Sequence, residues 1–292
     1  MKLDFFYIAL IFVISLSTLA KAEDNYTLFN PTPENKLREI ETERPSKSDG
    51  ANTVNPGHVQ VETSLVSYDK NKDCDSGSCS KSTSISFADG TNIRLGLTQN
   101  SEVQLIVSPY AKQKITVDNY SHDEAEGFGD STVRFKYSFS GNEGEQVGLA
   151  IIPFIKMPSN QNGLGNNDVE GGVGLPFYFD LDGDWIIGGM TQVNFLKDQG
   201  SARSYRNAYY NAYANTIYLY KTLADKLVGY AEYYTYKADI SNSAINARVK
   251  ATADFGLIYS VSNRWQIDMG ANFGLTKAAD DLNIFLGSSY LF

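Results

Sequence analysis

The sequence predicts an all-β protein, a closed transmembrane antiparallel up-and-down β-barrel of about 12 strands. Three observations lead to this fold class. Apolar and polar residues alternate in repeated runs over residues 57–292, as in strands with two different faces. After residue 22 no apolar stretch approaches the roughly 18 residues of a membrane-spanning helix, so any membrane residence must use strands. The 24 Gly, 19 Tyr and 16 Phe suit strands, tight turns and aromatic belts.

The end of the chain carries the clearest single strand, residues 283–292. Alternation gives it one apolar face that ends in Tyr290 and Phe292. The spacing of Gly287, Tyr290 and the terminal Phe292 resembles the closing-strand signal of bacterial outer-membrane β-barrels, which implies recognition by the barrel-assembly machinery. Phe285 departs from that signal, which prefers a polar residue there. An ordinary edge strand is the alternative interpretation.

Residues 1–22 have the features of a cleaved signal peptide. The apolar run from Leu3 to Ala20 is short for a spanning helix, and Ala20-Lys21-Ala22 supplies the small-x-small pattern of a cleavage site. An uncleaved anchor is the alternative. Export of a β-barrel predicts residence in the outer membrane of a Gram-negative bacterium, with outer-membrane lipid as a partner.

The net charge of −9 argues against a nucleic-acid partner, whose phosphates favour a basic face. Cys74 and Cys79 lie close together in a polar stretch, and in an exported chain such a pair predicts a disulfide that closes a loop tip. No metal site is expected, since only His58 and His122 could add imidazole ligands and neither is near the cysteines in sequence. No cofactor is expected either.

Residues 23–56 are polar, carry Pro and Gly, and lack sustained periodicity, which predicts a periplasmic N-terminal linker or plug. Residues 57–292 then predict the outer-membrane β-barrel. Its expected strands are 58–69, 82–98, 103–117, 131–140, 146–157, 169–180, 185–197, 206–222, 228–239, 248–261, 265–276 and 283–292.

The connectors between these strands alternate in length. Residues 99–102 form a short one, and residues 118–130 form a long one. Short periplasmic turns and longer outer loops are typical of outer-membrane barrels. Barrels of about ten or fourteen strands remain alternatives, because strand boundaries read from a pattern are imprecise. A soluble sandwich would also show the alternation, and the terminal aromatic and the signal peptide favour the barrel.

Extending the alternation assigns charged residues of both signs to the inward face of the barrel. They are Arg94, Arg134, Lys136, Lys156, Glu170, Glu232, Lys250, Asp254 and Asp268. Such a set could neutralise itself as ion pairs that hold the wall together, or it could line a wet passage. Tyr209, Tyr213, Tyr230 and Tyr234 share the inward parity and could contact an aromatic or amphipathic solute, whereas outward tyrosines would form an interfacial girdle.

Enzyme chemistry finds little support, and no catalytic residue is expected. A hydrolase would need a nucleophile, a base and an orienting group held in one geometry. Ser121, His122 and Asp123 follow one another directly, and neighbours in sequence rarely form such a triad. His58 stands at the start of the first expected strand, away from a plausible serine.

Several short motifs resemble one family when they are taken together. They are Glu43-Arg-Pro45, Thr53-Val-Asn-Pro-Gly57, Val59-Gln-Val-Glu62, Ile93-Arg-Leu-Gly-Leu-Thr98, Gly127-Phe-Gly-Asp130, Pro153-Phe-Ile-Lys-Met-Pro158, Val169-Glu-Gly-Gly172 and Gly270-Ala-Asn-Phe-Gly-Leu-Thr-Lys-Ala-Ala-Asp-Asp281. Over about residues 40–292 the chain resembles the outer-membrane transporter family labelled for the MetA pathway of phenol degradation. The resemblance implies an outer-membrane barrel that passes small solutes, among them aromatic compounds.

The expected function is that of an outer-membrane channel or transporter for passive movement of small solutes, aromatic or hydrophobic compounds included, with the solute unidentified. The alternative is a closed structural barrel that presents its extracellular loops to partners and transports nothing. The two differ in whether the inward charges pair across a filled lumen.

Overall fold

The computed structural model describes residues 25–75, 78–117, 121–181, 184–197, 209–239 and 248–292, so the predicted signal peptide lies outside the described residues. The described part contains one 3-10 turn, η1 (Glu34–Lys36), and the rest of its regular structure is β-strand. The strands are β1 (Val59–Asp75), β2 (Ser78–Thr98), β3 (Ser101–Val107), β4 (Tyr110–Val117), β5 (Ser121–Gly127), β6 (Ser131–Ser140), β7 (Val147–Met157), β8 (Glu170–Leu181), β9 (Trp185–Lys197), β10 (Tyr209–Ala224), β11 (Leu227–Asp239), β12 (Lys250–Ser262), β13 (Trp265–Gly274) and β14 (Leu282–Leu291).

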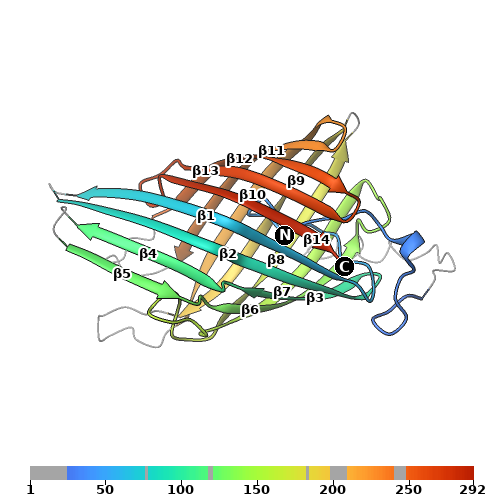
Figure 1. The fold of residues 1–292 in the computed structure, drawn as a ribbon, viewed down its shortest axis with the longest axis horizontal. Coiled ribbons are helices and arrows are strands. Elements are labelled where there is room, and N and C mark those ends of the chain that lie inside the picture. The colour runs from blue at the N-terminus through green and yellow to red at the C-terminus, as the bar shows by residue number, and fades with distance from the viewer. Residues whose placement is uncertain (1–24, 76–77, 118–120, 182–183, 198–208, 240–247) are drawn as a thin grey trace, which may run out of the picture.

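The strands form a closed antiparallel barrel (Figure 1). β1 pairs with β2 on one side and with β14 on the other, so the first and last strands close the ring. β3 and β4 are successive parts of one path, because β3 pairs with residues 91–98 of β2 and β4 with residues 80–87. β6 continues the path of β5 in the same way. The closed ring therefore has 12 strands, and the predicted fold class is confirmed.

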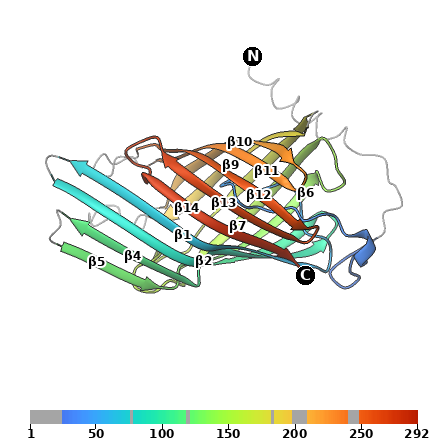
Figure 2. The same cartoon turned by 45° about the horizontal axis from the view of Figure 1, so that its top comes forward.

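Two predicted connectors are mostly strand. Residues 70–81 were expected to join two strands, but β1 continues to Asp75 and β2 begins at Ser78. Residues 118–130 were expected to connect two strands, but residues 121–127 form β5, which pairs with β4. Figure 2 shows β1, β2, β4 and β5 extending beyond the other strands at one end of the barrel. β5 has no apolar face to mark it in the sequence. Ion pairs with β4 accompany the pairing instead, with 3.2 Å between Lys114 Nζ and Glu124 Oε1.

The distribution of side chains is reversed relative to a soluble protein. Along β12 the outward-facing Phe255 and Leu257 are exposed, whereas the inward-facing Asp254 is buried. On β13 Met269 is exposed and Asp268 is buried. An apolar outer surface around a polar interior is the arrangement of a barrel in lipid. None of the helical segments in the described part of the chain is long and apolar enough to cross a membrane.

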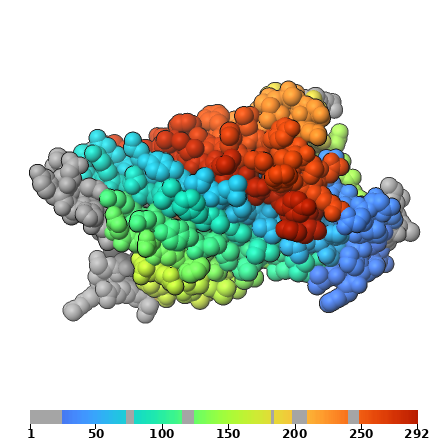
Figure 3. All heavy atoms as spheres, viewed as in Figure 1, coloured from blue at the N-terminus to red at the C-terminus, as the bar shows by residue number. Residues whose placement is uncertain are grey.

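The two ends of the barrel differ. We call the end with the connectors 99–100, 141–146, 225–226 and 263–264 the short-turn end, and the opposite end the long-loop end. The closing strands meet at the short-turn end, where the amide of Phe292 donates a hydrogen bond of 2.8 Å to the carbonyl of Val59. The N-terminal segment, drawn in blue in Figure 3, covers this end beside the C-terminal strand.

Residues 25–40 lie against the short-turn end. The amide of Leu28 donates to the carbonyl of Leu97 at 2.8 Å, and the amide of Ile40 donates to the carbonyl of Asn263 at 3.1 Å. Residues 41–55 then enter the lumen, and the chain returns to the same end before β1 begins. These contacts place a non-periodic polar segment inside the barrel, where it meets the charged inner wall.

Candidate functional site: a charged partition inside the barrel

Residues 41–55, which we call the partition, are held in the lumen by a buried ionic cluster. Arg94 of β2 is at its centre and is 1% exposed. Its guanidinium contacts carboxylates of the wall and of the partition: Glu62 at 2.7 Å, Glu102 at 3.0 Å and Glu43 at 3.2 Å. Removing one member of such a cluster would leave a buried charge without compensation.

Lys136 of β6 is the second buried cation of the cluster. Its ammonium group is fully buried, forms an ion pair with Glu43, and donates to the carbonyls of Gly50 at 2.9 Å and Asn52 at 3.2 Å. Burial alone would raise the pKa of Glu43, but Lys136 and Arg94 outweigh it and lower the pKa to about 2. Glu43 is therefore ionised at neutral pH.

The carboxylates of the wall also accept hydrogen bonds from the backbone of the partition. Glu62 accepts from the amide of Glu43 at 2.9 Å, and Glu102 accepts from the amide of Val54 at 2.6 Å. Glu232 accepts from the amides of Lys47 and Ser48 at 2.8 and 3.1 Å. The barrel wall thus satisfies backbone donors that a non-periodic segment cannot satisfy within itself.

Further ion pairs fasten the partition to other strands. Arg44 pairs with Asp268 of β13 and Lys47 lies 3.0 Å from Asp254 of β12. The ammonium group of Lys47 also lies 4.8 Å from the centre of the Tyr234 ring. Asp49 forms an ion pair with Arg134 of β6, and both side chains are mostly buried, 13% and 12% exposed. These contacts reach several sides of the ring.

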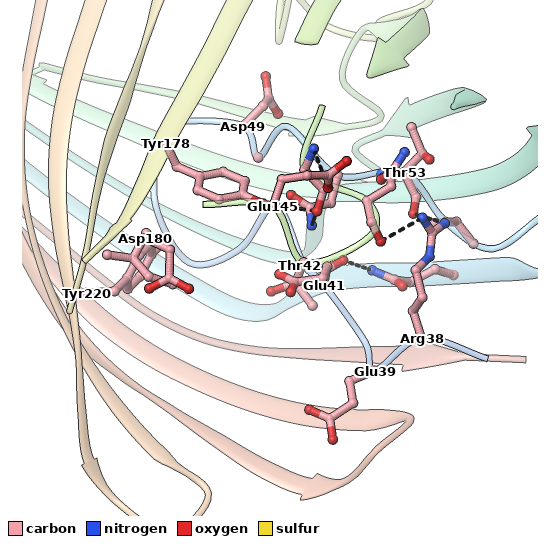
Figure 4. A pocket seen from close by; sticks show the side chains of 18 of the residues that line it. Arg38, Glu39, Glu41, Thr42, Asp49, Thr53, Glu145, Tyr178, Asp180 and Tyr220 are labelled. Atoms are coloured by element: carbon pink, nitrogen blue, oxygen red, sulfur yellow. Dashed lines mark hydrogen bonds between the residues drawn. The ribbon is translucent and has the colours of Figure 1, made fainter. Parts of the chain in front are cut away.

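Two cavities lie on opposite sides of the partition. The short-turn vestibule has a volume of about 500 Å³ and is lined by Ser46, Ser48 and Asp49 of the partition. The long-loop vestibule has a volume of about 400 Å³ and is lined by Arg44, Pro45 and Lys47. Neighbouring residues of the partition therefore face different cavities, so this segment separates the two halves of the lumen. Figure 4 shows the short-turn vestibule, with Glu41 and Thr42 of the partition across from Tyr178, Asp180 and Tyr220 of the strands.

The structure places most of the sequence-predicted lumen residues on the inner face. Arg94, Lys136, Glu170, Tyr230, Glu232, Asp254 and Asp268 are buried there, Arg134 pairs with Asp49, and Tyr234 and Lys250 line the long-loop vestibule. Lys156 lies 3.1 Å from Asp130 and 3.4 Å from Glu170. The charges of the wall mostly pair with the partition rather than only with one another.

Two predicted lumen residues are corrected by the structure. Tyr209 and Tyr213 lie on the outer face, 55% and 40% exposed, and the inward parity of β10 belongs to Tyr218 and Tyr220. The rule that polar residues face inward assigns the two faces of β10 wrongly. The outer face of this strand carries Asn211 and Asn215 beside tyrosines, while small apolar residues lie inside. Tyr209 instead donates to the carbonyl of Val169 at 2.8 Å, at the rim of the wall.

The partition residues were missing from the predicted site. A signal for them is present in the sequence, because residues 41–49 carry Glu41, Glu43, Arg44, Lys47 and Asp49 in one short stretch. Both signs of charge in a segment next to a barrel with inward charges of both signs indicate mutual pairing. Within the described ranges, no group of three or more His, Cys, Asp or Glu side chains has an arrangement that could hold a metal ion.

The predicted insertion and disulfide residues lie as follows. Tyr290 and Phe292 are exposed on the outer face and their rings pack edge to face, 4.8 Å apart. Gly287 faces inward, where an added Cβ would overlap the guanidinium of Arg44. Cys74 and Cys79 are opposite each other in the backbone register of β1 and β2. That register brings their Cα atoms within the range a disulfide needs.

Residues 42–292 match the protein family described as "Putative MetA-pathway of phenol degradation". The chain belongs to this family. The resemblance seen in the sequence motifs is thereby confirmed, and the matched region begins at the partition.

Solved structures share the fold of this family member at low sequence identity. The COG4313 outer membrane channel from Pseudomonas putida F1 has a TM-score of 0.60 at 12% identity, with 87% of this chain and 100% of that chain covered. The transport unit of the autotransporter AIDA-I from Escherichia coli has a TM-score of 0.56 at 10% identity, with 87% and 93% covered. The NanC porin has a TM-score of 0.50 at 10% identity, with 80% and 98% covered. No curated protein matches the sequence.

Proposed function

We propose that this protein is a passive outer-membrane channel for small solutes, aromatic or hydrophobic compounds included, and that the partition closes it at rest. The observation that carries the proposal is the pair of polar vestibules, about 500 and 400 Å³, separated by residues 41–55. Both are lined by charged and hydrogen-bonding groups, which remain compatible with water once the partition moves.

The path of the partition allows it to move. The chain enters the lumen after Ile40, which is bonded to Asn263, and leaves it at Pro56, whose carbonyl accepts from Thr32 at 3.0 Å. Both points lie at the short-turn end, so the segment is a loop that can withdraw without threading through the barrel. Its contacts are mostly ion pairs and hydrogen bonds, which water can replace when the loop leaves.

The proposal also covers the export, oxidation and location of the protein. We infer export by a signal peptide over residues 1–22, a disulfide between Cys74 and Cys79, and residence in the outer membrane of a Gram-negative bacterium. The closed barrel and its similarity to an outer membrane channel support that location. Recognition of Phe292 by the barrel-assembly machinery and the absence of catalysis remain predictions.

A liposome-swelling assay tests the channel. Refolded protein should let sugars, organic acids and small aromatic compounds enter faster than protein-free liposomes do, with a size limit. The rate should rise when residues 41–55 are replaced by a Gly/Ser segment of equal length. If neither protein admits any solute although both are folded in the bilayer, the protein is instead a closed barrel that presents its loops. The extensive ion pairing in the lumen favours this alternative hypothesis.

A further inference from the structure

Three tyrosines form one wall of the short-turn vestibule. Tyr178 comes from β8, and Tyr218 and Tyr220 come from β10. Tyr178 is paired in register with Gly148, and Tyr218 with Gly188. A Cβ at either glycine would overlap the tyrosine ring beside it. Each ring therefore lies over a glycine of the neighbouring strand, and the missing side chain of the glycine leaves room for the ring on the inner wall.

Tyr218 has an unsatisfied hydroxyl. The residue is 6% exposed and lines the vestibule, and its ring packs 4.8 Å from that of Tyr220. Among the described residues its hydroxyl makes no hydrogen bond, whereas the hydroxyl of Tyr178 donates to the carbonyl of Gly141 at 3.0 Å. The Tyr218 oxygen is not among the fully buried side-chain atoms that lack a partner, so it is accessible from the cavity and available to a bound molecule.

Acidic side chains also line the vestibule. Glu39, Glu41, Glu143 and Asp180 line it, and within the described part of the chain their carboxylates form neither ion pairs nor hydrogen bonds. Figure 4 shows Asp180, Tyr220 and Tyr178 on one side of the cavity, with Glu41 and Glu39 on the facing side.

Arg38 is the cation among the described lining residues, and its guanidinium donates hydrogen bonds to the protein. It donates to Asn55 Oδ1 at 3.2 Å, to the carbonyl of Thr53 at 2.9 Å and to that of Asn142 at 3.3 Å. These bonds hold the guanidinium against the end of the partition. The unpaired charge that faces the cavity is thus negative.

We propose that the short-turn vestibule is a binding site for a small organic cation, an ammonium ion carrying an aromatic or alkyl group. Tyrosine faces attract a cation through the ring quadrupole, and free carboxylates compensate its charge. An N–H of the ammonium group can donate to the Tyr218 oxygen, while its apolar group rests on the rings. A cavity of about 500 Å³ has the size of a small-molecule site. The proposal deepens the proposed channel function by naming a solute class.

Equilibrium dialysis of the full-length protein in a nonionic detergent tests the site, with detergent alone as the blank. Three probes of similar shape differ in charge: phenethylammonium, 2-phenylethanol and 3-phenylpropanoate. Phenethylammonium should bind saturably, at least about 5-fold more tightly than either other probe, as expected for one cation–π contact and nearby carboxylates. Equal binding of the three probes, or binding of none, overturns the proposal.

Variants locate the site. Asp180→Asn should weaken phenethylammonium binding by about 5-fold, and Tyr218→Leu by more, whereas Tyr218→Phe should retain the part that depends on the ring. Asp280→Asn, which changes a carboxylate of the long-loop vestibule, is the matched control and should bind as the parent does. Asp180 is exposed, so its replacement should fold even if Tyr218→Leu does not. Binding unchanged in Asp180→Asn but reduced in Asp280→Asn would contradict the assignment.

The result is independent of the test for transport. Binding is measured on the closed protein and needs no passage of solute. Saturable cation binding without liposome swelling would retain the site and reject the channel. Swelling without any preference for the cation would retain the channel and reject the site.

Discussion

Arg44 of the partition and Asp268 of β13 form a two-pronged ion pair inside the barrel, with Nε–Oδ2 and Nη2–Oδ1 distances of 3.1 and 2.8 Å across a sequence separation of 224 residues. The third nitrogen of Arg44 donates to Ser64 Oγ at 2.7 Å. The guanidinium also lies 5.4 Å from the centre of the Phe285 ring. One side chain of the partition therefore joins β1, β13 and β14.

Replacing Arg44 should loosen the partition. Arg44→Met leaves the buried Asp268 without its partner, and breaking such a pair costs about 3–5 kcal/mol. We expect more frequent openings in planar-bilayer recordings. Arg264→Met is the control, because its ion pair with Glu34 lies at the solvent-exposed short-turn end. Equal behaviour of both variants and the parent would show that Arg44 does not hold the partition.

The acid response of the channel should follow Glu43. Its pKa is lowered to about 2, so the stability it gives the closed state is complete above its usual value of 4.5 and is lost as the pH falls from there through 2. We expect Glu43→Gln to open more often than the parent at pH 7, and the difference between the two proteins to shrink below pH 4.5. A parent protein whose openings become frequent between pH 7 and pH 5, with Glu43→Gln unchanged, would contradict this role.

Deleting Phe292 should impair assembly and closure. The deletion removes the hydrogen bond of 2.8 Å from the amide of Phe292 to the carbonyl of Val59. It also removes the carbonyl of Phe292, which lies 2.9 Å from His58 Nδ1, and an exposed aromatic ring. We expect far less folded protein in the outer membrane than for Phe285→Ala, whose side chain points inward. Membrane fractionation with heat-modifiable gel mobility measures both. Normal abundance of the truncated protein would argue against the terminal strand as an assembly signal.

The cysteine pair should be oxidised in the exported protein. Cys74 and Cys79 are paired in the backbone register of β1 and β2, and the six-residue span closes only a small ring. Its stabilisation should lie below the ~3 kcal/mol of a fifteen-residue loop. Thiol labelling without reductant should find no free cysteine, and full labelling after reduction is the control. Labelling of the untreated protein would remove the disulfide from the account.

Strand periodicity in the sequence predicts the positions of most strands and the face on which many of their residues lie. A period of two identifies the strands and places residues such as Asp254 and Asp268 on one face, because the pleat ties side-chain direction to position. On β10 both faces mix tyrosine with small or polar residues, so Tyr209 and Tyr213 were assigned to the wrong face. β5 was missed because its alternation carries no apolar face.

The partition could not be predicted from periodicity. Its conformation depends on groups distant in sequence, as the pairs of Arg44 with Asp268 and Glu43 with Lys136 show. Its backbone amides are satisfied by wall carboxylates such as Glu232 rather than by a regular ladder. Charge content alone indicates that the segment and the lumen can pair, and only the three-dimensional arrangement shows which residues do so.

Single-channel recording tests most directly whether residues 41–55 close the lumen. The parent protein should show a low conductance with rare openings, and the protein in which these residues are replaced by a Gly/Ser segment of equal length should conduct steadily. Joining the partition to the wall through Asp49→Cys and Arg134→Cys with a short bis-methanethiosulfonate linker, which takes the place of their ion pair, should abolish the openings of the parent, and reduction of the linker's disulfides should restore them. Equal conductance of the parent, the replaced and the cross-linked proteins would contradict the account.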